Sequence, residues 1–225
     1  IDIGYNRSGL EYNSPEIDEI IKTCEQSNNL IFKGFLTHDG RNYSAIGKAE
    51  IERNLVEAIN IFKRLKQKYP GAIFSWGDTP SCSLVEDLGF FDELRPGNFV
   101  YYDVMQYHIG SCSLDEIAVA VACPVVSINK SRSELVIYGG AVHFSKEFIA
   151  ADNNFTLFGY VVNIENNKWL NPINGAYVAR LSQEHGIIKM PPKELEKFKP
   201  GDIVGILPIH SCLTANLLPD NYIIV

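Results

Sequence analysis

A histidine and a cysteine lie two positions apart in the apolar stretch GILPIHSCLTANL, residues 205–217. We expect this stretch to be a strand, in which alternate side chains point to one face, so that His210 and Cys212 converge. An imidazole and a thiolate together suit Zn²⁺, and two protein ligands leave coordination positions open for a substrate. The alternative interpretation is a buried thiol packed beside a hydrogen-bonded histidine.

Four segments are expected to be parallel strands, and at three of their four carboxyl ends glycine or polar residues follow directly after the apolar strand. These carboxyl ends are residues 4–7, 37–43 (THDGRNY), 77–81 (GDTPS) and 101–103. In a parallel βα array, functional groups collect at the carboxyl ends of the strands. Free backbone N–H groups and small side chains there are what a phosphate-bearing cofactor needs, and GDTPS also precedes an expected helix. An ordinary turn with a helix cap would have the same sequence.

These candidate groups must be positioned by two different kinds of structure. Over residues 1–108, strands are expected at 1–5, 30–38, 72–77 and 98–104, and helices at 14–27, 48–69 and near 81–88. Residues 109–225 contain short β-type segments separated by turn residues, and no helix of any length is expected there. The sequence therefore predicts an α/β domain with a parallel sheet over 1–108 and an antiparallel β domain over 109–225.

The composition excludes several classes of partner. The net charge is −7 at pH 7, which argues against nucleic-acid binding, because that needs clustered Lys and Arg. No apolar stretch approaches the roughly 18 residues of a membrane-spanning helix. The five cysteines are scattered and form no Cys-x-x-Cys pair, which favours a reducing cytoplasm over a disulfide framework.

Six short motifs occur in one order along the chain: DIGYNRSG, GFLTHDGRNYSA, GDTPSCS, ELRPGNFVYYD, LSQEHG and PIHSCLTANL. Together they resemble the alanine-racemase-like (fold type III) pyridoxal-phosphate enzymes, in the branch of D-serine dehydratase and D-threonine aldolase. The resemblance implies an eight-stranded (β/α)8 barrel followed by a β domain, a pyridoxal 5′-phosphate cofactor and a homodimer. The dehydratases of this branch resemble His-x-Cys zinc sites, which is the form seen at His210 and Cys212.

The resemblance also implies roles for residues of the first domain. His38 and Tyr43 fall where the family places catalytic groups around the cofactor ring, and Arg7 matches an arginine near the phenolic oxygen of the cofactor. The phosphate is expected at Gly77, Asp78, Thr79, Gly97 and Asn98, with Asp78 contributing only its N–H. The alternative interpretations are that His38 only caps a strand end through a backbone bond and that Arg7 is an exposed loop residue.

Only four βα strands are expected before the β domain, whereas the family has eight. We therefore expect this chain to be the C-terminal half of the barrel plus the β domain, with the N-terminal half-barrel supplied elsewhere. The lysine that forms the Schiff base in the family would lie in that missing half, and no lysine of this chain is assigned to its role.

The resemblance implies a PLP- and zinc-dependent lyase acting on a small D-3-hydroxy amino acid, with elimination to a keto acid and ammonia. Retro-aldol cleavage of the D-threonine aldolase type stays open at this point, because the same metal could acidify the hydroxyl rather than help it leave. An amino-acid racemase and a non-catalytic module of the same fold are the remaining alternatives.

Overall fold

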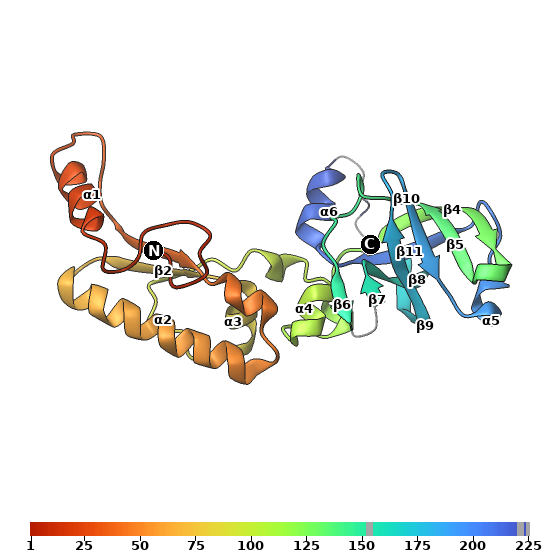
Figure 1. Cartoon of the computed structure of the whole chain (residues 1–225), viewed down its shortest axis with the longest axis horizontal. Coiled ribbons are helices and arrows are strands. Elements are labelled where there is room, and N and C mark those ends of the chain that lie inside the picture. Colours follow the sequence, from red (N-terminus) through yellow and green to blue (C-terminus); the bar gives the residue numbers. More distant parts are fainter. Residues whose placement is uncertain (152–154, 220–222, 224–225) are drawn as a thin grey trace. The chain divides into compact units, whose positions relative to one another are not determined.

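The computed structural model describes residues 1–151, 155–219 and 223 (Figure 1). The chain divides into two compact units, one of residues 1–99 with 109–111 and one of residues 100–108 with 112–225.

The first unit contains a parallel sheet of three strands in the order β1-β2-β3. The strands are β1 (Gly34–His38), β2 (Ile73–Gly77) and β3 (Glu93–Leu94). The helices are α1 (Glu16–Glu25), α2 (Lys48–Lys68) and α3 (Thr79–Leu84), with 3₁₀ turns η1 (Gly40–Ser44) and η2 (Asn98–Val100). The register pairs His38 with Gly77, so the carboxyl ends of β1 and β2 lie side by side.

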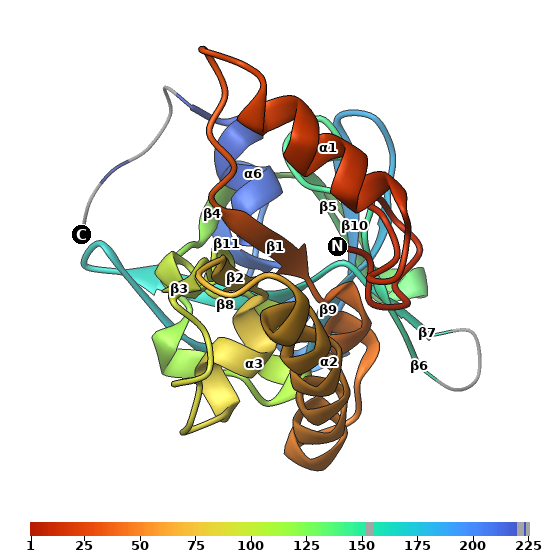
Figure 2. The same cartoon turned by 90° about the vertical axis from the view of Figure 1, so that its left-hand side faces the viewer.

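The core of this unit is aromatic. Helix α2 has its apolar residues at helical spacing, and this face lies along the sheet (Figure 2). Phe62 of α2 makes edge-to-face contacts with Phe74 and Trp76 of β2 and with Phe91. Phe62, Phe74 and Trp76 are all fully buried. This packing holds β2 firmly, and with it the loop that leaves its carboxyl end.

The second unit is built around a closed antiparallel barrel in the strand order β10-β5-β4-β11-β8-β9. Its strands are β4 (Val121–Asn129), β5 (Glu134–Tyr138), β8 (Gly159–Glu165), β9 (Lys168–Leu181), β10 (His185–Lys189) and β11 (Ile203–Pro208). A separate hairpin is formed by β6 (Ile149–Ala151) and β7 (Phe155–Leu157). Short helical segments are α4 (Val104–Ile109), η3 (Leu114–Glu116), η4 (Lys130–Arg132), α5 (Pro192–Leu195) and α6 (Ser211–Leu217).

Alternation along the strands fills the barrel. Leu135 and Ile137 of β5, Ile188 of β10, and Val204 and Ile206 of β11 are each fully buried and belong to one apolar cluster. Side chains at every second position of a strand point to the same face, so these residues meet inside the barrel. The barrel gives β11 a fixed end, from which the His-x-Cys segment leaves.

Two expected strands are wrong. Residues 1–5 form a single bridge, Asp2 to Glu11, because the Asp2 carboxylate accepts hydrogen bonds from the N–H groups of Gly4 and Asn6 and turns the chain. Residues 98–104 form η2 and the start of α4, and the third strand is β3 instead. The aromatic residues at 99–102 imitate a strand, but Asp103 accepts a bond from the N–H of Gln106 and so starts a helix.

The expectation of no helix after residue 109 is also wrong. Helices α5 and α6 are short, but α6 contains Cys212, and its presence changes the geometry of the candidate metal site.

Candidate functional site

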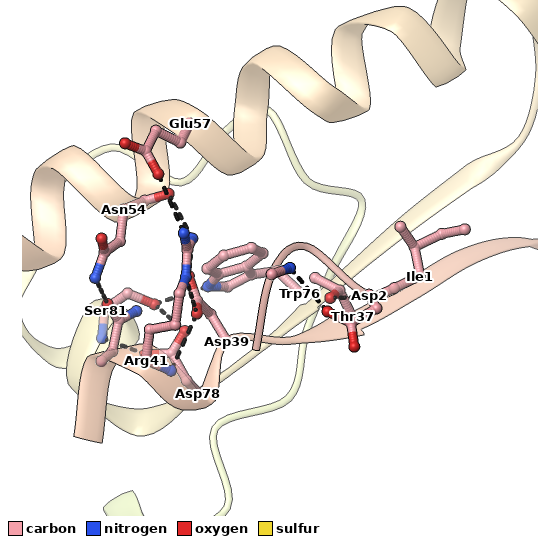
Figure 3. Close-up of polar contacts among 12 residues, drawn as sticks. Ile1, Asp2, Thr37, Asp39, Arg41, Asn54, Glu57, Trp76, Asp78 and Ser81 are labelled. Atoms are coloured by element: carbon pink, nitrogen blue, oxygen red, sulfur yellow. Dashed lines mark hydrogen bonds and ion pairs between the residues drawn. The ribbon is translucent and has the colours of Figure 1, made fainter. Parts of the chain in front are cut away.

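The loop that follows β1 is held rigid by a buried carboxylate. Asp39, fully buried, accepts two hydrogen bonds from Arg41, Nε to Oδ1 and Nη2 to Oδ2, both at 2.8 Å. Arg41 also reaches Glu57 of α2 at 3.1 Å, and Asn54 of the same helix donates to Asn42 at 2.9 Å (Figure 3). A planar bidentate pair of this kind fixes orientation as well as distance. The Asp39–Arg41 pair therefore sets the positions of the nearby residues His38 and Tyr43.

Three of the residues predicted to surround the cofactor come together at the carboxyl edge of the sheet. The N–H of Asn98 donates to the Thr79 hydroxyl at 3.0 Å, and the N–H of Thr79 donates to the Tyr43 hydroxyl at 3.4 Å. Thr79 and Asn98 are buried. These groups come from three separate segments, and they present N–H and O–H groups of the kind that bind a phosphate.

Gly77 lies directly beneath an arginine. A Cβ at this position would lie 3.0 Å from Arg95 Nη1 and 3.2 Å from the Arg95 carbonyl oxygen, so a larger residue would push the guanidinium away. Arg95 is anchored at its other nitrogens, because Nε donates to the Ser75 hydroxyl at 2.6 Å and Nη2 to the Thr37 carbonyl at 2.7 Å. The guanidinium is thus fixed over a glycine at this edge of the sheet, with the Glu93 carboxylate 3.3 Å from Nε as its ion-pair partner. Gly97, by contrast, has open space around its Cα.

Asp78 is a helix cap. Its carboxylate accepts bonds from the N–H and the hydroxyl of Ser81, both at 2.7 Å, and Ser81 in turn accepts a bond from the Trp76 indole at 2.7 Å (Figure 3). Burial raises the pKa of Asp78 from 3.8 to about 6, despite these hydrogen bonds. The carboxylate thus turns into helix α3, which leaves the Asp78 N–H as its possible contribution to an anion.

His38 ends β1 and lies beside Tyr43, with the two ring centroids 5.7 Å apart. Burial lowers the pKa of His38, and the charges of Arg7 and Arg95 lower it further, so the imidazole is neutral at pH 7. A hydrogen bond to the backbone of Gly77 opposes this shift, which is the strand-end contact of the alternative interpretation. His38 therefore has a backbone partner and a pKa below its ordinary value.

Arg7 lies on a turn beside β1. Its guanidinium is 5.7 Å from the centroid of the Tyr5 ring, and Tyr5 packs against Gly40, where even a Cβ would collide with the ring. A cavity of about 150 Å³ lies here, lined by Ile1, Asp2, Tyr5, Arg7, Ser8, Gly9, Leu36, Thr37 and His38. Arg7 and His38 thus share one small cavity.

The residues at this edge fit the phosphate and ring of pyridoxal phosphate. The fit depends on the Thr79 hydroxyl facing the Asn98 N–H and on the space that Gly77 leaves under Arg95. Neutral donors and one anchored cation are the groups that hold a phosphate dianion.

The His-x-Cys segment is not a strand. Strand β11 ends at Pro208, His210 is the N-cap of α6, and Cys212 lies in the first turn of that helix. The two side chains nevertheless approach one another, because Cys212 forms a hydrogen bond with the His210 ring. The expected convergence is present, but a helix start produces it rather than strand alternation.

Glu147 provides a second contact to this histidine. The Glu147 carboxylate lies 2.7 Å from His210 Nδ1, and since a carboxylate only accepts, Nδ1 carries the hydrogen and Nε2 is the nitrogen left for a metal. The pKa of His210 is raised to about 9, first by the bond with Cys212 and next by Glu147, against the effect of burial. A metal ion at this position would have to displace that proton.

Two ligands are what the described residues offer to a metal at this position. Among residues 1–151, 155–219 and 223, no group of three or more His, Cys, Asp or Glu side chains is arranged to hold a metal ion. His210 and Cys212 fit Zn²⁺ by their donor atoms and would leave its other positions open. The zinc site stays a prediction.

Two residues that contact the candidate sites, Arg95 and Glu147, were not among the predicted site residues. Arg95 lies within the quoted motif ELRPGNFVYYD, so its position after an expected strand was a usable signal. Glu147 lies in a segment, residues 145–148, whose sequence carries no recognisable motif. The contact between Glu147 and His210 joins residues 63 positions apart, which no local pattern reports.

A cavity in the second unit lies away from the His210–Cys212 pair. It has a volume of about 760 Å³ and is lined by Leu114, Asp115, Asn163, Trp169, Leu170, Asn171, Pro172, Ile173, Asn174, Glu194 and Leu207.

Within the part of the chain that the structure describes, no helix is both long and apolar enough to cross a membrane.

Two family models match adjacent parts of the chain. Residues 1–104 match the N-terminal domain of alanine racemase, and residues 118–225 match the putative serine dehydratase domain. Together they cover nearly the whole sequence, in the order in which the two units occur.

Curated relatives match over the full chain. The D-serine dehydratase of Dictyostelium discoideum is 31% identical over 247 residues, covering 100% of this chain and 59% of that protein. The D-serine dehydratase of Saccharomyces cerevisiae is 26% identical over 259 residues, covering 100% of this chain and 58% of that protein. The chain therefore spans less than two thirds of the length of these relatives.

Solved structures show the same fold. An alanine-racemase-like protein from Idiomarina loihiensis superposes with a TM-score of 0.81 at 28% identity, covering 96% of this chain and 58% of that one. The D-threo-3-hydroxyaspartate dehydratase from Delftia sp. HT23 has a TM-score of 0.76 at 22% identity, covering 95% of this chain and 58% of that one. At that identity the second match supports the fold alone.

Proposed function

Because this chain belongs to the alanine-racemase-like proteins and carries a D-serine dehydratase domain, we propose that it is part of a lyase that eliminates water from a D-3-hydroxy amino acid. D-Serine is the preferred candidate substrate. Loss of water leaves an enamine, and hydrolysis of its imine tautomer by one water molecule then gives a keto acid and ammonia. Pyridoxal 5′-phosphate and Zn²⁺ are the proposed cofactors.

The observation that carries the proposal is the arrangement of His210, Cys212 and Glu147. A thiol and an imidazole nitrogen lie together, and a carboxylate at 2.7 Å holds the ring by its other nitrogen. Metal-binding histidines usually have a carboxylate or carbonyl partner of this kind, which orients the ring and raises its basicity. A bound Zn²⁺ supplies Lewis acidity, which makes a β-hydroxyl a better leaving group.

The first unit supplies the proposed binding groups for the other cofactor. Thr79, the N–H of Asn98 and the Arg95 guanidinium would bind its phosphate, and Tyr43 would orient its ring through the hydroxyl that the Thr79 N–H already contacts. Pyridoxal phosphate supplies an electron sink that stabilises a carbanion next to the bound amino group.

His38 is the proposed group on the substrate side. Its lowered pKa keeps the imidazole neutral, so it can accept a proton or a hydrogen bond at pH 7 without a charge change beforehand. Arg7 shares its cavity and would favour an anionic oxygen there.

We further propose that the parallel sheet of this chain is part of a (β/α)8 barrel, as the C-terminal half followed by the β domain. Three parallel strands are described here, and the relatives are longer than this chain. The Schiff-base lysine would then lie in the part of the barrel that these 225 residues do not contain. A homodimer is the proposed assembly.

The test is an assay of the intact protein with D-serine and D-threonine, each with and without a strong chelator. We expect pyruvate and ammonia from D-serine, loss of turnover with chelator, and recovery when Zn²⁺ is added back. The His210→Ala and Cys212→Ala variants should lose turnover in the same way. His108→Ala is the matched control, because His108 bonds to Tyr160 and to none of these residues.

Other products would assign another reaction. Glycine plus an aldehyde from D-threonine would indicate retro-aldol cleavage, and loss of optical activity without product release would indicate a racemase. Turnover that survives both the chelator and the two alanine substitutions would remove the metal from the proposal.

A further inference from the structure

Asp103 is a buried carboxylate shared by two helices. It is 1% exposed, Oδ1 accepts the N–H of Gln106 at 2.9 Å, and Oδ2 accepts the N–H of Ser211 at 3.2 Å. The first bond caps α4 in the usual local way, three residues along the chain. The second bond crosses 108 residues and joins the first amide of α6.

This second bond replaces a cap that α6 lacks. The N-cap residue of α6 is His210, and its side chain makes no capping bond to the helix. The first N–H groups of a helix need an acceptor outside the helix, and a buried helix start without one is unfavourable. Because Asp103 accepts the Ser211 N–H, the His210 ring is left to contact Glu147 and Cys212 instead.

Two further hydrogen bonds hold the backbone on either side of Asp103. The residue before it, Tyr102, has a φ of 46°, which is a left-handed backbone conformation uncommon for an aromatic residue. The N–H of Asp103 hydrogen-bonds to the Cys112 thiol, and the N–H of Met105 donates to the Ile209 carbonyl at 3.4 Å. Strained backbone persists only where surrounding contacts hold it in place. The segment 102–105 is therefore held against residues 209–211 by two hydrogen bonds, from the Ser211 N–H to Asp103 and from the Met105 N–H to Ile209.

We infer that Asp103 is a positioning residue for the His210–Cys212 pair: by capping α6 in place of His210, it sets the backbone of residues 210–212 so that imidazole and thiol converge on one ion. The part of this inference that concerns the metal rests on the proposed function. The capping of α6 by Asp103 does not depend on it. Asp103 acts through the backbone of α6, whose first N–H it accepts.

Two substitutions separate positioning from folding. Asp103→Asn keeps one oxygen for the Gln106 N–H and so keeps the cap of α4, but it presents an amide donor to the Ser211 N–H. Asp103→Ala removes both acceptors and serves as the severe case. Asp202→Asn is the matched control, because Asp202 accepts a backbone bond from Lys199 at 2.8 Å, next to the opposite end of β11 from His210.

Metal binding is measured on the intact protein after chelation, by Zn²⁺ competition with a chromophoric chelator and by the thiolate-to-cobalt absorption of the Co²⁺ form. We expect Asp103→Asn to weaken Zn²⁺ binding by about 10- to 100-fold, as for other groups that position metal ligands. The thiolate-to-cobalt band should weaken in the same variant, and Asp202→Asn should match the unchanged protein. Wild-type affinity and an unaltered band in Asp103→Asn would overturn the inference.

Amide hydrogen exchange at Ser211 gives a readout that needs no metal. It should accelerate in Asp103→Asn and not in Asp202→Asn, because the exchanging N–H has lost its acceptor. Unchanged exchange would overturn the inference even if metal binding fell. If the unchanged protein took up no metal while exchange still accelerated, the metal role would fail and the positioning of α6 by Asp103 would stand.

Discussion

The raised pKa of Asp78 predicts an unusual pH dependence of stability in the first unit. Its pKa is 3.8 as a free carboxyl and about 6 in the folded protein, because the carboxylate is buried. Between these values the folded chain binds more protons than the unfolded chain, so the free energy of unfolding falls as the pH rises. The slope that this residue adds fades as the pH moves below 3.8 or above about 6.

The magnitude follows from the shift. A difference of about 2 pH units at about 1.4 kcal/mol per unit corresponds to about 3 kcal/mol. Asp78→Asn keeps an oxygen for the Ser81 N–H and cannot ionise, so it lacks this loss. Part of this change lies below pH 4, so the stability of Asp78→Asn relative to the unchanged protein should rise by about 2 kcal/mol between pH 4 and pH 7. Subtracting the free energy of unfolding of the unchanged protein from that of the variant at each pH removes the contribution of every other titrating group.

The assay is urea unfolding at several pH values from 4 to 7 in a Trp169→Phe background. Fluorescence then reports Trp76, which is fully buried in the first unit and bonds to Ser81. Asp87→Asn is the control, since Asp87 is exposed and accepts a local bond from Gly89 at 2.9 Å. A stability difference between Asp78→Asn and the unchanged protein that is the same at pH 4 and pH 7 would refute the reasoning.

Three further predictions concern other parts of the chain. Glu147→Gln should weaken Zn²⁺ binding by about 10- to 100-fold, measured by chelator competition, because the His210 ring loses its carboxylate partner; unchanged affinity would contradict the orientation given to the ring. Burial raises the pKa values of Cys112 and Cys123 to about 12, so at pH 8 both thiols should react with iodoacetamide far more slowly than free cysteine, and mass spectrometry of the labelled peptides would reveal rapid labelling if this is wrong. Phe62→Ala should lower the free energy of unfolding of the first unit by about 3–5 kcal/mol, since it leaves a cavity among three aromatic rings; a loss below about 1 kcal/mol in urea unfolding would show that the core collapses to fill it.

The elements with a strong repeating pattern could be predicted from the sequence. Helix α2 was expected at 48–69 and spans Lys48–Lys68, and α1, β1 and β2 lie inside their expected ranges. Each has its apolar residues at the spacing of its own backbone period, which is a local property. The expected strand at 98–104 is wrong because its aromatic residues satisfy a strand pattern, while the capping bond of Asp103 decides for a helix.

The candidate site divides along the same line. The resemblance carried by the six short motifs implied Tyr43, Thr79 and Asn98 as cofactor-binding residues, and the structure brings these three residues together at the carboxyl edge of the sheet. Alternation in a strand predicted the approach of His210 and Cys212 for the wrong reason. Arg95 and Glu147 could be recognised only from their contacts with Gly77 and His210 in the folded chain.

The sequence by itself determined which segments have a helical or an extended period, since this is a property of neighbouring residues, and through the resemblance of its motifs it predicted which residues would hold phosphate, ring and metal. Tertiary structure decided the charge state of Asp78, the cap of α6 and the partner of the His210 ring. Each of these depends on burial or on a bond between residues far apart in the chain, such as the 108 positions between Asp103 and Ser211, and the energy of such a bond is not written in either segment.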